Sequence, residues 1–372
     1  MTKLNDLDVV VNKFIRQWFR MPRSTHLGVL LHSKGLDIPR PSDMYLVGHA
    51  SVLASASQHD VKLQEAIEEK AFNPPKTALQ QNILDLANVS STTSALKNTG
   101  IALRDSQVEA KARDRPKQGA AVALFDVMDS DQSWKSCIHG LSESAYSFVL
   151  NSMCDSLPTN NNLKLWNKVL SSQCKLCDAF KETIMHVLNA CPRMLDRYKW
   201  RHDNVLHVLH EFVLECYKDK SNCEVLCDIV IQNGHIQSDQ YKKTIPDDVY
   251  LTAERPDLVI VDRSGKRVVI VELTIPFEQN FQKAYTRKAA RYRLLIAGIE
   301  EQGFTCNYFS FEIGSRGIVY QGTSAILREI TGAQRKDVKE QITKLSKCAM
   351  KCSYVIFRDK NNLNSSLSYV MQ

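Results

Sequence analysis

The spacing of apolar side chains predicts helices along the first half of the chain. Between residues 7 and 19, apolar side chains recur with a helical period. We therefore expect a helical region over residues 1–170. Beyond the first helix, the expected helices cover residues 45–56, 61–71, 79–87, 101–113, 120–127 and 142–153.

Two short aliphatic runs further along the chain predict a β-hairpin. Residues 258–261 and 268–271 are β-branched or aliphatic, and the polar residues 262–266 between them are typical of a turn. If Ser264 and Gly265 are the two turn residues, Asp257 faces Glu272, with Cβ atoms about 5 Å apart. Carboxylates this close repel each other unless a cation lies between them, which suggests a site for an ion such as Mg²⁺. Two solvated carboxylates at strand ends fit the same spacing.

A basic helix is expected directly after this hairpin. Pro276 ends the second strand, and residues 279–299 are rich in helix-forming side chains. Lys288 and Tyr292 are four positions apart, so they project from one face of that helix. Three further basic side chains form a ridge that either follows a phosphate backbone or is simply the solvated side of the helix. They are Lys283, Arg287 and Arg291.

The cysteines upstream of the hairpin have metal-ligand spacing. Cys174, Cys177, His186 and Cys191 follow the pattern Cys-x2-Cys-x8-His-x4-Cys. Three thiolates and an imidazole suit tetrahedral Zn²⁺. We therefore predict a structural zinc site, against the alternative of buried free cysteines near an unrelated histidine.

The other cysteines and histidines with regular spacing are expected to be structural residues rather than metal ligands. The pairs Cys223/Cys227 and Cys348/Cys352 have helical i, i+4 spacing and no histidine or third thiol at ligand distance, so they are expected on core faces. The histidines at 202, 207 and 210 fall along or just before an amphipathic helix at 204–217, where partial burial is expected rather than metal binding. Residues 304–313 are expected to form a strand, 338–351 a helix and 233–248 a loop.

Length, charge and cysteine content give only weak information about the class of protein. The chain has 372 residues, enough for two or three domains, and its net charge of +7 mildly favours a polyanionic partner. Its 11 cysteines fit a reducing compartment better than a disulfide framework. The first residues are polar, and no apolar run approaches eighteen residues, so neither a signal peptide nor a membrane partner is expected.

The zinc pattern followed by the acidic hairpin and basic helix resembles one family. It is the C-terminal part of site-specific non-LTR retrotransposon proteins, where a CCHC zinc knuckle precedes a restriction-like PD-(D/E)xK endonuclease. The matching positions begin at Arg255-Pro256-Asp257 and continue with Glu272, Lys288 and Tyr292. The usual nuclease lysine lies two residues after the acidic one, where this chain has Thr274, so Lys288 from the following helix is the candidate replacement.

Other segments share the resemblance. Residues 151–159 (NSMCDSLPT) and Arg201-His202-Asp203 resemble motifs that flank the knuckle in that family. Residues 15–25 and 32–43 resemble the thumb and post-thumb region that follows a reverse transcriptase. A polymerase is not expected in this chain, because Asp247-Asp248 lacks the aromatic residue of a reverse transcriptase active site.

The resemblance implies an α+β protein with three parts. These are a helical thumb and linker region at 1–170, the knuckle and its following helix at 171–220, and an α/β nuclease-like core at 221–372. It implies a nuclear enzyme that nicks target DNA for target-primed reverse transcription, alongside element RNA and a reverse transcriptase supplied in trans. The alternative is a catalytically decayed nucleic-acid-binding protein.

The same resemblance implies roles for single residues. Asp257 and Glu272 would hold catalytic Mg²⁺ or Mn²⁺, Lys288 would stabilise developing negative charge, and Tyr292 would position the lysine or the phosphate. The residues implied in nucleic-acid binding are Arg201, Lys283, Arg287 and Arg291.

Overall fold

The computed structural model mixes helices and strands, as expected for an α+β protein. It describes residues 2–59, 61–62, 65, 81–83, 85, 93–115, 117–232 and 235–362. The chain divides into two compact units, Met1–Phe125 with Met153–Ser156, and Asp126–Ser152 with Leu157–Gln372. The domains expected at 1–170, 171–220 and 221–372 stay predictions, because a compact unit of the fold need not have the same boundaries as a domain expected from a family resemblance.

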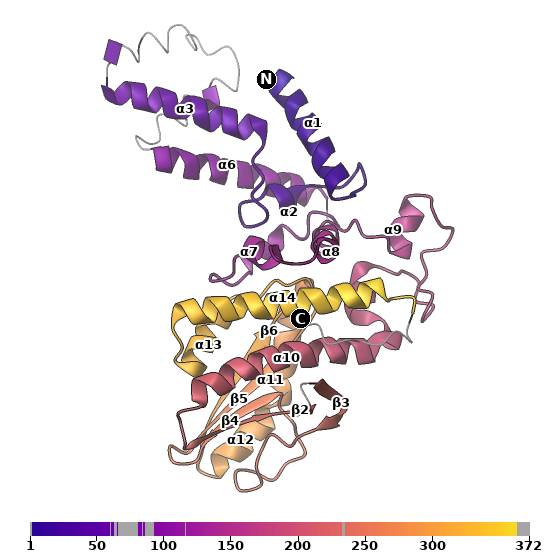
Figure 1. Ribbon diagram of the computed structural model, residues 1–372, viewed down its shortest axis with the longest axis vertical. Coiled ribbons are helices and arrows are strands. Elements are labelled where there is room, and N and C mark those ends of the chain that lie inside the picture. The colour runs from indigo at the N-terminus through magenta and orange to yellow at the C-terminus, as the bar shows by residue number, and fades with distance from the viewer. Residues whose placement is uncertain are drawn as a thin grey trace. The chain divides into compact units, whose positions relative to one another are not determined.

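The first unit is helical in its described part, as its apolar period predicted. Its α-helices are α1 (Thr2–Trp18), α2 (Gly28–Leu31), α3 (Pro41–His59) and α6 (Thr93–Arg113) (Figure 1). The expected helices at 45–56 and 101–113 lie inside α3 and α6. Those at 61–71 and 79–87 fall largely outside the described residues. The helix expected at 120–127 is wrong, because only the 3₁₀ turn η1 (Ala123–Asp126) forms there.

The second unit is built around a four-stranded sheet. Its strands follow the order β1 (Cys223–Cys227), β4 (Leu258–Asp262), β5 (Arg267–Thr274) and β6 (Thr305–Glu312). The first three are antiparallel, and β6 runs parallel to β5. Asp262 pairs with Arg267 and Leu258 with Val271, which confirms the hairpin register expected from the sequence.

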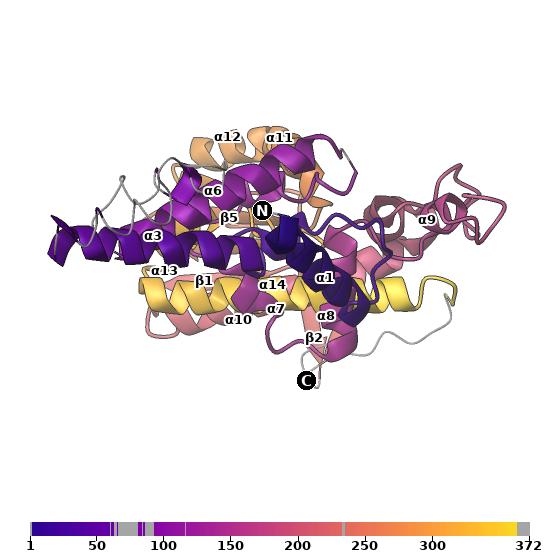
Figure 2. The same ribbon diagram turned by 90° about the horizontal axis from the view of Figure 1, so that it is seen from above.

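Side chains of the central hairpin alternate between two helix layers, because successive residues of a strand point to opposite faces. Leu258 and Val271 pack in the core formed with α10 (Leu195–Tyr217), α13 (Thr323–Thr331) and α14 (Arg335–Arg358). Val259 and Ile270 pack on the opposite face with α12 (Arg293–Glu301). Helices α10 and α14 lie side by side, as Figures 1 and 2 show.

Several local predictions are wrong, because long-range pairing overrides local spacing. Cys223 and Cys227 lie on strand β1 and not on a helix, whereas Cys348 and Cys352 lie on α14 as expected. The loop expected at 233–248 contains β3 (His235–Tyr241), which pairs with β2 (Ile229–Gln232). The helix expected at 279–299 is divided at Tyr292 into α11 (Phe281–Arg291) and α12.

The remaining elements of the second unit are short. They are α7 (Trp134–Ile138), α8 (Glu143–Met153), α9 (Asn160–Leu165), η2 (His186–Ala190), η3 (Pro192–Met194) and η4 (Glu278–Asn280). Among the described residues, no helix combines the length and apolarity needed to span a membrane.

Candidate functional site

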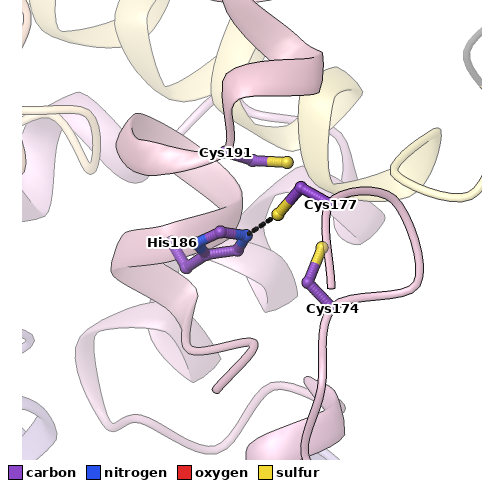
Figure 3. Close-up of side chains that lie close together, drawn as sticks. All are labelled: Cys174, Cys177, His186 and Cys191. Carbon is purple, nitrogen blue, oxygen red and sulfur yellow. Dashed lines mark hydrogen bonds between the residues drawn. The ribbon is translucent and has the colours of Figure 1, made fainter. Parts of the chain in front are cut away.

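The four residues with zinc-ligand spacing converge in the structure. The sulfur atoms of Cys174, Cys177 and Cys191 and a ring nitrogen of His186 all lie within 4.8 Å of one another. Figure 3 shows the four side chains pointing toward one another. Ligands about 2.3 Å from a tetrahedral Zn²⁺ lie roughly 3.7 Å apart, so the donor set and its spacing fit this ion.

Local backbone geometry brings the last two ligands together. His186 and Cys191 bracket the π-helical turn η2, and the amide of Cys191 donates to the carbonyl of His186 at 2.9 Å. The hydroxyl of Tyr198, from α10, donates to the carbonyls of His186 (3.1 Å) and Val187 (2.9 Å) and accepts from the amide of Cys191 (3.1 Å). Sequence reasoning did not single out Tyr198, which ties the ligand turn to the long helix.

Burial and the neighbouring thiol groups disfavour thiolates in this cluster when no cation is bound. Burial and the neighbouring thiol groups raise the pKa of Cys191 to about 12. Because Zn²⁺ binds the thiolate form, its charge would offset both the burial and the mutual repulsion of the three sulfurs.

A second group of chemical side chains gathers at one end of the β4–β5 hairpin. Asp257 directly precedes β4 and is 8% exposed, and Glu272 on β5 is 1% exposed. The Asp257 amide lies 3.4 Å from Glu272 Oε2, and Asp257 Oδ2 accepts a 2.7 Å hydrogen bond from the Leu273 amide. Lys288 Nζ reaches Glu272 Oε1 from α11 and forms an ion pair with it. The structure thus brings together the aspartate, the glutamate and the lysine of the predicted site.

The two carboxyl groups have opposite pKa shifts. Burial alone would raise the pKa of Asp257, but the His202 ring, Lys288 and the Leu273 amide outweigh it and lower that pKa. Burial and the adjacent Asp257 charge raise the pKa of Glu272, against the opposing effect of Lys288. Tyr292 is fully buried beside Glu272, and burial together with the Glu272 charge raises the pKa of its hydroxyl.

His202, for which the sequence predicted partial burial without a functional role, also contacts this site. Its Nε2 lies 3.3 Å from Asp257 Oδ2 and 3.3 Å from the Leu273 carbonyl oxygen, and its Nδ1 lies 3.1 Å from Asp203 Oδ1. The side chain is 25% exposed. Burial alone would lower its pKa, but the charges of Asp257 and Asp203 outweigh this effect and raise the pKa to about 10. The Arg201-His202-Asp203 run was the only signal in the sequence.

Two clefts open at this site and share Lys288. The smaller has a volume of about 500 Å³ and is lined by both carboxylates, Asp228 and Tyr292. The larger has a volume of about 720 Å³, and its lining is strongly basic. Its basic lining residues are Lys199, Arg201, His202, Lys283, Arg287 and Lys288.

The residues predicted to contact nucleic acid fall into two groups. Lys283 and Arg287 are exposed and line the larger cleft. Arg291 forms an ion pair with Glu254 at 2.9 Å, and Arg201 is only 1% exposed and donates to Ser353 Oγ at 2.9 Å. Arg201 therefore does not occupy the surface position expected of a phosphate contact.

One comparison with known proteins bears on the zinc site. Residues 124–197 match the zf-RVT family model, described as zinc-binding in reverse transcriptase. All four candidate zinc ligands lie inside this segment. The match supports a retrotransposon-related protein. A comparison with curated proteins gives no match.

Proposed function

We propose that this protein is a metal-dependent DNA endonuclease that nicks target DNA for target-primed reverse transcription. The observation that carries the proposal is the meeting of Asp257, Glu272 and Lys288 in one cleft. These three residues come from the start of β4, from β5 and from α11, and the family resemblance assigns the same three to catalysis. A zinc-stabilised segment upstream would help to bind the nucleic acid.

The order of elements supports a PD-(D/E)xK type of core. Helix α10 is followed by β1, β4 and β5 as an antiparallel series, then by α11 and α12, and then by β6 parallel to β5. The acidic pair lies at one end of the two central strands. Thr274 takes the usual lysine position, and its hydroxyl is buried without a hydrogen-bond partner among the described residues. Lys288 therefore supplies the positive charge from the helix.

The oxygen atoms at the hairpin end suit Mg²⁺ or Mn²⁺. Asp257, Glu272 and the Leu273 carbonyl are the groups that would hold the ion, and carboxylate and carbonyl oxygens are its preferred ligands. When bound, such an ion supplies Lewis acidity for phosphodiester hydrolysis.

The protein side chains then have distinct tasks. Lys288, 19% exposed at the junction of the two clefts, is placed to stabilise negative charge that develops on the phosphate oxygens. Tyr292 lies against Glu272, where its hydroxyl helps to hold the carboxylate in place. Lys283 and Arg287 extend the positive charge along the larger cleft, which suits a phosphodiester backbone.

The experiment that tests the proposal is nicking of supercoiled plasmid with Mg²⁺ or Mn²⁺, compared with EDTA. We expect metal-dependent nicking that is lost in Asp257→Ala and in Lys288→Ala. Lys344→Ala is the matched control, because this exposed lysine pairs only with Glu340 on α14 among the contacts described. Nicking that persists in Asp257→Ala would remove the active-site assignment.

A second candidate function is nucleic-acid binding without cleavage. The observation that favours it is the extent of the family match, which covers the zinc segment and ends at residue 197, before Asp257. Salt-sensitive DNA or RNA binding by a chain that does not nick would support this function. The nucleus and a reverse transcriptase supplied in trans belong to both proposals as expected location and partner.

A further inference from the structure

Helix α10 carries a further group of metal-ligating side chains, formed by His207, His210 and Glu211. Each offers one ligand atom, and the three atoms lie within 4.8 Å of one another. His207 Nδ1 lies 3.8 Å from Glu211 Oε1. Residues three and four positions apart share one face of a helix, so α10 alone positions His207 beside the other two. His207 lies about 7.5 Å further along the helix axis than His202, which contacts the carboxylate site.

The group lies at the edge of the core, with one side open to solvent. The side chain of His207 is 13% exposed and that of Glu211 is 61% exposed, while His210 is partly buried. The partial burial expected from the sequence for both histidines is thus confirmed. His210 Nδ1 is buried and has no hydrogen-bond partner among the described residues. A buried polar nitrogen without a partner is costly, and coordination to an ion would remove that cost.

The charges that face the two rings leave them neutral. Burial lowers the pKa of both imidazoles, and Glu211 opposes this effect. Lys242, which directly follows β3, lowers the pKa of His210 further. Neutral imidazole is the form that binds a metal ion, and Glu211 supplies a negative charge beside it.

We propose that His207, His210 and Glu211 form a site for a divalent transition-metal ion such as Ni²⁺ or Zn²⁺. Imidazole nitrogens suit these ions, whereas Mg²⁺ prefers oxygen ligands. Ligand atoms bound to one ion at about 2.1 Å lie roughly 3.0–4.2 Å apart, so small side-chain rotations bring the three onto a shared ion. Three protein ligands leave coordination positions open to water or to a group from a partner molecule.

A bound ion would clamp one turn of α10 to the next. The unfolded chain holds no such preformed site, so binding of the ion stabilises the fold. A purely structural role for the two histidines makes a different prediction, because their removal would then change stability and leave the affinity for metal unchanged. This site does not depend on the proposed nuclease.

The test is calorimetric titration of the full chain with Ni²⁺, after one zinc ion per chain has been loaded at the cysteine cluster. Excess Mg²⁺ is present to occupy the carboxylates at 257 and 272. We expect His207→Ala, His210→Ala and Glu211→Gln each to weaken Ni²⁺ binding by at least about tenfold, since losing even a partner that orients a ligand costs 10–100-fold. Ni²⁺ should raise the thermal unfolding midpoint of the wild-type chain more than that of each variant.

Three matched controls should keep wild-type Ni²⁺ affinity. His139→Ala removes an exposed histidine outside the group, and Glu215→Gln removes an exposed carboxylate one turn further along α10. Asp257→Ala removes a carboxylate of the proposed nuclease, so retained Ni²⁺ binding in that variant separates the two sites.

The exposed position of Glu211 keeps the inference testable if a histidine variant does not fold. Wild-type Ni²⁺ affinity in Glu211→Gln or in a folded His210→Ala would overturn the inference. So would a wild-type chain that binds no Ni²⁺, or a chain whose Ni²⁺ binding is lost in Asp257→Ala.

Discussion

Lys288 forms an ion pair with Glu272 although one residue lies on helix α11 and the other on strand β5, sixteen positions earlier. In the endonuclease family that the sequence resembles, the lysine shares the strand with its acidic partner, whereas this chain has Thr274 at that position. Lys288 reaches Glu272 from the helix instead. In the proposed nuclease, the positive charge would therefore come from outside the strand, at the end of the hairpin where Asp257 also lies.

Lys288→Ala should lower the nicking rate by about 10²–10³-fold, the usual effect of losing one group that stabilises developing negative charge. Returning a lysine to the strand, in the double variant Thr274→Lys with Lys288→Ala, should restore part of the rate. Residues 272 and 274 point to the same face of β5, so the new ammonium group would approach Glu272. Rates of plasmid nicking measure both effects, and a double variant no faster than Lys288→Ala would count against a shared role.

Removing one zinc ligand should release the metal and loosen the surrounding turn. Cys191→Ser leaves three donors, and the turn η2 then loses the ion that holds it to the loop at Cys174 and Cys177. Elemental analysis should show zinc in the wild-type chain and little in the variant, whose thermal midpoint should fall. Cys223→Ser is the control, because Cys223 lies outside the cluster on β1; equal zinc loss in both variants would contradict the assignment.

The segment between β5 and α11 depends on a buried ion pair. Arg316 donates to Glu278 at 2.7 Å, both side chains are almost fully buried, and the guanidinium also lies over the ring of Phe277. Glu278→Gln should lower the free energy of unfolding by about 3–5 kcal/mol, because it leaves a buried cation without its counter-charge. Urea denaturation measures the change. Glu340→Gln breaks only an exposed pair with Lys344 and should change stability little.

DNA affinity should depend on the exposed basic residues of the larger cleft. Lys283→Ala and Arg287→Ala should each reduce the slope of log affinity against log salt by about one, because each removes one phosphate contact. Arg291→Ala should have a smaller effect, since its guanidinium already pairs with Glu254. Titrations at several salt concentrations measure the slopes, and unchanged slopes in the first two variants would exclude this cleft as the binding path.

Arg201 should behave differently from these surface residues. Its guanidinium is buried and bonded to Ser353, so Arg201→Ala should destabilise the fold rather than change the salt dependence of DNA binding. Thermal unfolding beside the same titrations distinguishes the two effects. If Arg201→Ala had a wild-type thermal unfolding midpoint but a reduced salt dependence of DNA affinity, Arg201 would be a nucleic-acid contact after all.

The sequence by itself determined the features that depend on short-range spacing. Two continuous aliphatic runs and the polar turn between them were enough to predict the hairpin register that places Asp257 beside Glu272, because the two turn residues fix which residues face each other. The spacing of three cysteines and His186 predicted a cluster that the structure brings together, because zinc ligands must fit one tetrahedron.

Only the tertiary structure decided which distant side chains reach these local features. Cys223 and Cys227 are four positions apart, the same spacing as the helical pair Cys348 and Cys352. They nevertheless lie on a strand, because β1 pairs with β4. Arg201 and His202 are adjacent in sequence, but the packing of α10 against the sheet gives them different environments. It brings His202 to Asp257 and buries Arg201. Spacing along one element predicts which residues share a face. It does not predict what the fold packs against that face, because that depends on contacts between residues far apart in the chain.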